Sequence, residues 1–349
     1  MRKFLRHTLV MLAVVAAALS GCGLIDEALE VCREEFSLFY RLRLITNLPE
    51  EMDGQLSDER DRPLQLALED HLKDIFAEYA RDVDLSFYAT DPAGQRLEHR
   101  SAVMNAGQAT YEIALPAADY HHLALANLAG NPVVQLTGAD LRDETCLQQQ
   151  AGEVVDSHTT GLFSARLPLS VQRNESRTFD VNLYMANDAG ALVVHRDSCD
   201  YVSIRAELLD LASGFRVCDS LYDFSARTSV SARLIDAAPF VEEGRPQWNK
   251  LPALLCGVGF PSLDTPVKAD EAIWRFALYV TLQDGTTTLS LISIGVPLQA
   301  GHLKIIRGYL KPDGRFVPGP PGPEPSKEPV VGVSVQLDWR EGMHFEPPL

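Results

Sequence analysis

The sequence predicts an all-β protein with one or two short helices, built as two successive β-sandwich domains. Short stretches of alternating polarity recur along the chain, and turn signals separate them. Apolar residues make up 46% of the 349 residues and charged residues 23%, which is enough apolar content for ordinary hydrophobic cores. A chain of this length exceeds a usual single domain, so we expect about two domains.

The beginning of the chain predicts a secreted bacterial lipoprotein. Basic side chains come first, at Arg2, Lys3 and Arg6, and an apolar run follows over residues 9–19. This run is shorter than the roughly 20 apolar residues that a membrane-spanning helix needs. It leads directly into a lipobox, Leu19-Ser20-Gly21-Cys22. We therefore expect a signal peptide over residues 1–21.

Cys22 is the predicted lipidation site, as an S-diacylglycerol and N-palmitoyl cysteine. Its thiol is the nucleophile that accepts diacylglycerol before the leader is cleaved, and several acyl chains hold a protein on a membrane far more firmly than one. Gly23 follows Cys22, so nothing there favours retention in the inner membrane. The expected location is the cell outer membrane. The alternative is that Cys22 is merely a small residue beside an ordinary cleavage site.

The other five cysteines allow two interpretations. They are Cys32, Cys146, Cys199, Cys218 and Cys256. An exported protein can form disulfides, but an odd number of cysteines cannot all pair within one chain, and their spacing does not give the connectivity. Cys199 and Cys218 could close a small loop between strands. The preferred interpretation is that these cysteines are small buried hydrophobic residues.

Charge and motif content exclude several classes of function. The chain has 48 acidic and 31 basic residues, a net charge of -17, so its surface repels phosphate backbones and we expect no nucleic-acid partner. The sequence contains no nucleophile elbow, phosphate-binding loop, zinc-protease motif or dinucleotide fingerprint. We therefore expect no enzyme activity, no cofactor and no metal site.

Three further groups of side chains have an ordinary structural explanation. His121 and His122 are adjacent, and neighbours on a strand point to opposite faces, so they cannot chelate one ion together. Acidic pairs are expected to be solvated rather than catalytic, although sequence alone cannot place distant carboxylates; these pairs are Glu34-Glu35, Glu50-Glu51 and Glu242-Glu243. The tryptophans are expected to be core anchors rather than a glycan-binding platform; they are Trp248, Trp274 and Trp339.

The first half of the chain should contain one helix among strands. A strand is expected over residues 36–45. Apolar residues then recur at spacings of three and four from Pro63 to Tyr79, which predicts an amphipathic helix of about 17 residues. A turn is expected over 91–94, and the strands that complete this half are expected over 83–88, 111–115 and 120–126.

The second half should consist of strands, after a polar interval over residues 144–157. These strands are expected over 161–166, 178–185, 191–194, 202–208, 273–280 and 303–306. Six prolines between Pro318 and Pro329 then predict a loop, because proline cannot donate to a sheet. The last strand is expected over 330–339, where Val331, Val333 and Val335 share one face.

These elements give the following domain organisation. The signal peptide occupies 1–21 and a lipidated tether 22–34. The N-terminal β-sandwich domain occupies 35–156, and the C-terminal β-sandwich domain occupies 157–349 and includes a Pro-rich loop over 317–329.

The chain resembles the FimB-type fimbrial anchor lipoproteins of Bacteroidia, which stand at the base of type V fimbriae. No single segment is diagnostic, and the order of segments carries the resemblance over nearly the whole mature chain. The segments are Leu19–Cys22, Cys32–Tyr40, Asp82–Tyr88, Tyr120–Asn127, Ser157–Phe163, Val181–Asn187 and Val333–Trp339.

The resemblance implies two tandem transthyretin-like β-sandwich domains in a protein that attaches a fibre to the outer membrane and limits its length. It implies a partner, the major fimbrillin of the shaft, which would be bound by strand addition, and lipid on Cys22. Two alternatives remain: a lipid-anchored surface protein that binds carbohydrate, and an accessory or tip adhesin of a fimbria. Binding to immobilised polysaccharide would separate a carbohydrate-binding protein from an anchor.

Overall fold

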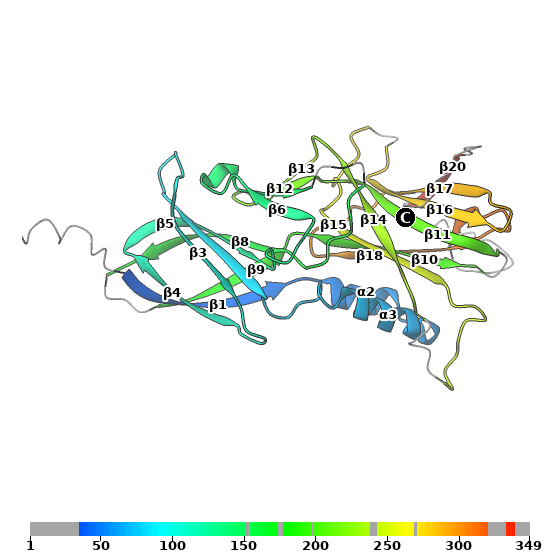
Figure 1. Cartoon of the computed structure of the whole chain (residues 1–349), viewed down its shortest axis with the longest axis horizontal. Helices are drawn as coiled ribbons and strands as arrows, with labels where there is room; N and C mark the ends of the chain where they lie inside the picture. Colours follow the sequence, from blue (N-terminus) through cyan, green and yellow to red (C-terminus); the bar gives the residue numbers. More distant parts are fainter. Residues whose placement is uncertain are drawn as a thin grey trace, which may run out of the picture.

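A computed structural model describes residues 35–338 except 151, 153, 174–176, 197–198, 238–242, 269–270 and 320–332. It confirms the all-β prediction, because the described residues form sheets of seven, nine and four strands with two short α-helices. Figure 1 shows an elongated molecule with the seven-stranded sheet at one end and the nine-stranded sheet at the other. The helices lie below these two sheets in that view. The four-stranded sheet lies above the region where the two large sheets meet.

The seven-stranded sheet folds over into a sandwich. Its order is β3 (Arg96–Val103), β2 (Asp82–Tyr88), β5 (Ala118–Ala126), β8 (Phe163–Val171), β9 (Arg177–Met185), β1 (Glu35–Ile45) and β4 (Thr110–Pro116). The ring of Tyr40 on β1 meets the edge of His122 on β5 at 5.5 Å between centroids, although the two strands are not neighbours in the sheet. Residues of β1, β2, β5 and β9 therefore share one hydrophobic core.

The nine-stranded sheet also encloses a core of its own. Its order is β19 (Phe316–Pro318), β18 (Leu303–Leu310), β10 (Asp188–His195), β15 (Ala253–Gly259), β14 (Thr228–Ile235), β11 (Tyr201–Leu211), β16 (Trp274–Leu282), β17 (Thr287–Ile294) and β20 (Val333–Asp338). Leu192 on β10, Leu255 on β15 and Phe276 on β16 are fully buried in one cluster, so the two halves of the sheet face each other.

A small sheet covers the region between the two large ones. Its order is β13 (Leu221–Asp223), β12 (Gly214–Arg216), β7 (Cys146–Gln149) and β6 (Val134–Thr137). Leu147 and Phe215 from this sheet are buried in one cluster with Leu123 of β5 and Phe260, which follows β15. A 3-10 turn, η3 (Arg142–Glu144), precedes β7.

The helices lie against the nine-stranded sheet, and the second is shorter than predicted. They are α2 (Leu48–Gln55) and α3 (Arg62–Leu72), with a 3-10 turn, η2 (Glu59–Asp61), between them. Pro63 lies in the first turn of α3, where proline is well tolerated. The predicted helix of about 17 residues ends at Leu72. Beyond it the N–H groups of Ile75 and Phe76 both donate to the carbonyl of Leu72, and the carbonyl of Asp74 accepts a hydrogen bond from Gly161 N–H, a tertiary contact.

Strands from the two sides of the expected domain boundary at residues 156 and 157 pair with each other. β8 and β9 follow this position, and they pair with β5 and β1, which precede it. β7 lies inside the polar interval 144–157 and pairs with β12, which comes later in the chain. Of the Pro-rich loop 317–329, Val317 and Pro318 belong to β19, and residues 320–329 lie outside the described residues.

Candidate functional site

The predicted lipidation site, Cys22, lies outside the described residues, as does Cys32. Cys146, Cys199, Cys218 and Cys256 are free thiols, so no disulfide joins the pair Cys199 and Cys218. Cys199 and Cys256 are buried, as the hydrophobic interpretation requires, and burial raises the pKa of Cys256 to about 12. Cys146 and Cys218 are half-buried.

The two adjacent histidines of β5 have separate environments, as predicted. His122 is fully buried; its ring stacks on Phe87 at 4.3 Å between centroids, and Nδ1 donates a 3.0 Å hydrogen bond to the carbonyl of Ser86. Burial lowers the pKa of His122 to about 4, so it is a neutral core residue near pH 7. His121 is half-buried and lines a surface cavity.

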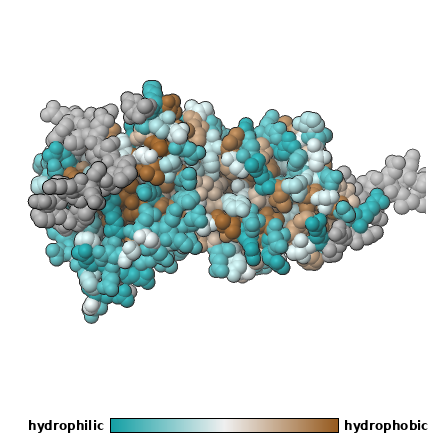
Figure 2. Space-filling view, turned by 180° about the vertical axis from the view of Figure 1, so that it is seen from behind, coloured by the Kyte–Doolittle hydropathy of each residue, from teal (hydrophilic) through white to brown (hydrophobic). Residues whose placement is uncertain are grey.

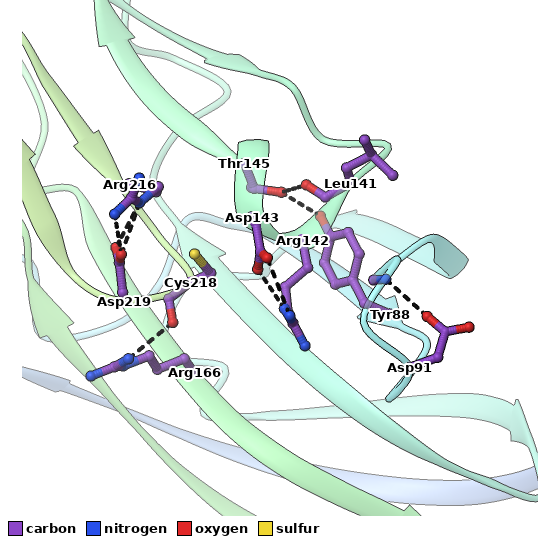
Figure 3. Close-up of polar contacts among 11 residues, drawn as sticks. Tyr88, Asp91, Leu141, Arg142, Asp143, Thr145, Arg166, Arg216, Cys218 and Asp219 are labelled. Atoms are coloured by element: carbon purple, nitrogen blue, oxygen red, sulfur yellow. Dashed lines mark hydrogen bonds and ion pairs between the residues drawn. The ribbon is translucent and has the colours of Figure 1, made fainter.

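This cavity, which we name the arginine cavity, has a volume of about 620 Å³. Its floor is formed by β5 and β8, where His121 pairs with Pro168 and Leu123 pairs with Arg166 across the two strands. Its walls come from η3 and from the end of β12 with the turn after it. The charged residues that line it are Arg142, Asp143, Arg166, Arg216 and Asp219 (Figure 3).

Two of the three arginines in the cavity form ion pairs with a nearby aspartate. Arg142 Nε donates to Asp143 Oδ1 at 2.7 Å, and this bond raises the pKa of Arg142 and lowers the pKa of Asp143. Arg216 Nε donates to Asp219 Oδ2 at 2.8 Å, and Arg216 Nη2 contacts the same carboxylate. This contact lowers the pKa of Asp219.

Arg166 differs from the other two arginines in its partner. Its Nη1 donates a 2.9 Å hydrogen bond to the backbone carbonyl of Cys218, 52 residues away in the chain. Within the described part of the chain, no carboxylate lies at ion-pair distance from this guanidinium. The cavity therefore holds three guanidinium groups and two carboxylates, one positive charge in excess.

The segment that carries Arg142 is fixed by a hydrogen bond to β2 and by another within the segment. Tyr88 Oη donates a 2.9 Å bond to the carbonyl of Ala139, and Thr145 Oγ1 donates to the carbonyl of Leu141 at 2.9 Å. Gly138 begins this turn with φ of 64°, and a Cβ there would lie 2.1 Å from the carbonyl oxygen of Glu144. A larger residue would therefore displace the turn and with it the wall of the cavity.

Among the residues that the structure describes, the acidic pairs and tryptophans do not gather into one site. Glu51 holds α2 on β18, because His302 Nδ1 and Leu303 N–H each lie 2.6 Å from its carboxylate oxygens. Trp274 is fully buried in the core of the nine-stranded sheet, as predicted. Glu34, Glu242 and Trp339 lie outside the described residues.

A second feature is the line along which β8 and β9 separate. The two strands pair only at Phe163 with Met185 and at Ser164 with Tyr184. Over 165–171 on β8 and 177–183 on β9 the ladder between them does not continue; we name this stretch the β8–β9 seam. Ala165, Leu167 and Phe179 point toward the sandwich core from its two sides, and all three are only half-buried.

The hydropathy of the surface, the helices and the clusters of potential metal ligands do not point to another site among the described residues. Figure 2 shows mainly hydrophilic residues on the face opposite to that of Figure 1, with hydrophobic groups reaching the surface chiefly along the middle of the body. Within the described ranges, no helix combines the length and apolar character needed to cross a membrane. The same residues contain no group of three His, Cys, Asp or Glu side chains suited to a metal ion.

Comparison with known proteins gives structural resemblances alone. Solved structures similar to this chain include proteins described as fimbrial, as candidate adhesins and, from Bacteroides thetaiotaomicron, as a candidate polysaccharide-binding protein. No protein-family profile and no curated protein sequence matches. The fimbrial anchor protein Mfa2 of Porphyromonas gingivalis is 10% identical with a TM-score of 0.46, covering 87% of this chain and 98% of its own. A candidate adhesin from Bacteroides ovatus is 9% identical with a TM-score of 0.48, covering 89% and 97%.

The tip fimbrial protein Mfa3 of Porphyromonas gingivalis, with a C-terminal truncation, gives a TM-score of 0.40 at 11% identity. This likeness covers 87% of the present chain and 100% of that one. All three TM-scores are below 0.5, so the likeness assigns neither a fold family nor a function to this chain.

Proposed function

We propose that this chain is a non-enzymatic outer-membrane lipoprotein that anchors fimbriae to the cell surface and limits their length. The observation that carries the proposal is the leader that ends in Leu19-Ser20-Gly21-Cys22. Lipid on Cys22 holds the base of the fibre in the membrane, since several acyl chains anchor a protein stably. Such anchoring supports cell adhesion and biofilm formation.

The coupling to the major fimbrillin of the shaft takes place by strand addition at the β8–β9 seam. Each side of the seam offers backbone N–H and C=O groups that have no partner in the other strand. An extended segment inserted there forms ladder hydrogen bonds, and its alternate side chains cover Leu167 and Phe179. These two residues are the half-buried apolar groups that such side chains would bury.

The outer edge at β3 is less suited to this coupling. The side chains of β3 include Arg96, Glu98 and Arg100, and charged side chains on an edge strand oppose pairing with another chain. An anchor needs only one coupling edge, because lipid holds its other end. A single edge also ends growth at the base, and this is how the chain limits fibre length.

The proposal is tested with Cys22→Ala, and Cys146→Ala serves as the control because it removes a thiol that belongs neither to the lipobox nor to the arginine cavity. Cys22→Ala should abolish metabolic labelling with a fatty acid and release the chain from the outer-membrane fraction. Shaft fibres should be shed into the medium and should be longer by electron microscopy. Continued labelling, or attached fibres of unchanged length, would contradict the proposal.

The arginine cavity favours a second candidate function, a lipid-anchored protein that binds carbohydrate. It combines hydrogen-bond donors and acceptors in a volume suited to a small ligand. Retention of the chain on immobilised polysaccharide, together with normal fibres on cells that lack it, would favour this candidate over the anchor.

A further inference from the structure

The arginine cavity has the chemistry of a site for an acidic sugar. We propose that it binds the carboxylate-bearing ring of a uronic acid within a surface oligosaccharide. This inference rests on the second candidate function, carbohydrate binding at this cavity, and not on anchoring. The cavity shares Arg166, Leu167 and Pro168 with the β8 side of the seam, and the evidence for it is the charges, hydrogen bonds and shape of the cavity.

The positive charge of the cavity selects an anion. Three guanidinium groups face two carboxylates, in a chain whose net charge is -17. Arg166 makes its hydrogen bond through Nη1 to a neutral carbonyl, which leaves Nε and Nη2 available to a ligand. A guanidinium presents its N–H groups as a planar fork that matches a carboxylate in two parallel hydrogen bonds. Arg166 is therefore the expected carboxylate-binding residue.

The two aspartates limit the charge of the ligand and bind its hydroxyl groups. Asp143 and Asp219 each accept hydrogen bonds from an arginine, and they remain acceptors on the walls of the cavity. Carboxylate oxygens accept further hydrogen bonds from hydroxyls, whereas they repel a polyanion such as a sulfated chain. A ligand with one carboxylate and several hydroxyls satisfies both requirements.

The size and lining of the cavity indicate a ring rather than a simple carboxylate ion. A volume of about 620 Å³ lies within the range of small-molecule sites, roughly 300–1,000 Å³. Leu123 and Pro168 provide apolar surface on the floor beside the charged groups, and a sugar ring offers C–H surface to such residues. The hydrogen bond from Arg166 to Cys218 joins floor and wall, so the site is held in place before a ligand arrives.

The test measures binding of full-length lipoprotein in detergent to an acidic trimer that contains one galacturonic acid ring and two galactose rings, with a neutral galactose trimer as the matched probe. Wild-type protein should bind the acidic trimer at least about tenfold more tightly than the neutral one. A hydrogen bond between charged groups contributes enough binding free energy for a difference of that size. Added salt should weaken the binding. Inorganic sulfate should not compete.

The variants are Arg166→Gln, Arg216→Gln and the control Arg41→Gln. Arg166→Gln should weaken binding of the acidic trimer about tenfold, and Arg216→Gln should weaken it as well. Arg41 pairs with Asp180 at 3.1 Å on the exposed surface, and neither residue lines the cavity, so loss of Arg41 should leave binding unchanged. Circular dichroism confirms that each variant folds.

Three outcomes would overturn the proposal. They are equal binding of the acidic and neutral trimers, unchanged binding of the acidic trimer by folded Arg166→Gln, and competition by sulfate at equal concentration.

Discussion

Arg307 on β18 donates a 2.5 Å hydrogen bond to Oδ2 of Asp61, a residue that is only 1% exposed. The same guanidinium donates to the carbonyl of Gln55 at 2.8 Å. These bonds connect the end of α2 and the start of α3 to a strand about 250 residues later in the chain. They fix the helices on the nine-stranded sheet.

We therefore expect Asp61→Ala to lower the free energy of unfolding by about 1–3 kcal/mol, because it removes the charged one of the two acceptors of Arg307 and leaves only the carbonyl of Gln55. Asp180→Ala is the matched control, since its ion pair with Arg41 is exposed and such pairs contribute below about 1 kcal/mol. Urea unfolding followed by circular dichroism measures both. Equal losses of unfolding free energy in the two variants would show that the buried contact stabilises the fold no more than an exposed ion pair does.

Two glycines should respond in opposite directions to substitution by alanine. In Gly308→Ala the new Cβ would lie 2.2 Å from Phe316 Cζ and 2.4 Å from the carbonyl oxygen of Val317, so β19 would have to move. We expect a loss of about 1–3 kcal/mol of stability. Gly54 in α2 has no atom within 4 Å of its added Cβ, and Gly54→Ala should raise stability by about 0.5–1 kcal/mol. Thermal unfolding tests both, and a destabilised Gly54→Ala would contradict the helix assignment.

Alternation of one buried and one exposed face explains only part of the strand prediction, because β3 and β17 alternate in burial without having been predicted, whereas β10, predicted over 191–194, is buried throughout. β1, β9 and β11 alternate in burial along most of their length, and the expected strands over 36–45, 178–185 and 202–208 match them. β15 was not predicted, because all seven of its residues are buried and its sequence has no alternation. The helices cover one of its faces and the sandwich core covers the other, an arrangement that yields a continuous apolar run.

The arginine cavity could not be predicted from local sequence patterns. Arg142, Arg166 and Arg216 come from η3, β8 and β12, and each is a solitary basic residue in its own segment. Only the pairing of β12 with β7, and of β8 with β5, brings them together. The leader and lipobox are the opposite case, because their chemistry lies in consecutive residues.

Buried histidines should make the stability depend on pH. Burial lowers the pKa of His122 to about 4 and that of His158 to about 3, whereas in the unfolded chain both lie near 6.5. The unfolded state therefore binds more protons below pH 6.5. Stability is fully present above that pH and falls by up to about 1.4 kcal/mol per pH unit for each histidine as the pH approaches 4. Asp188, whose pKa burial raises, acts in the opposite direction.

His122→Phe isolates one of these contributions, because phenylalanine keeps a ring against Phe87 and cannot be protonated. The variant loses the hydrogen bond to Ser86, so its stability at pH 7 should be lower, yet its slope of stability against pH between 6 and 5 should be smaller than in the wild type. Urea unfolding at several pH values gives the slopes. Identical slopes would mean that His122 is accessible to protons in the folded state.

The last prediction concerns the coupling at the β8–β9 seam. Leu167 points toward the core from the open side of β8 and is half-buried, whereas Ser170 on the same strand is exposed. Leu167→Glu places a charge where an inserted strand would bury its own side chains, so binding of the shaft subunit should be lost. Ser170→Glu adds the same charge to the exposed position and should bind like the wild type.

Binding is measured with purified shaft subunit and full-length lipoprotein in detergent, with Leu167→Ala as a second variant that adds no charge. Leu167→Ala should retain the backbone ladder and bind more weakly than the wild type, because one apolar contact is smaller. Ladder hydrogen bonds and apolar contacts should supply most of the binding free energy. Moderate salt should therefore change the wild-type affinity little. Normal binding by folded Leu167→Glu would exclude the seam as the coupling edge. An equal loss in Ser170→Glu would instead indicate that charge, rather than strand insertion, controls the contact.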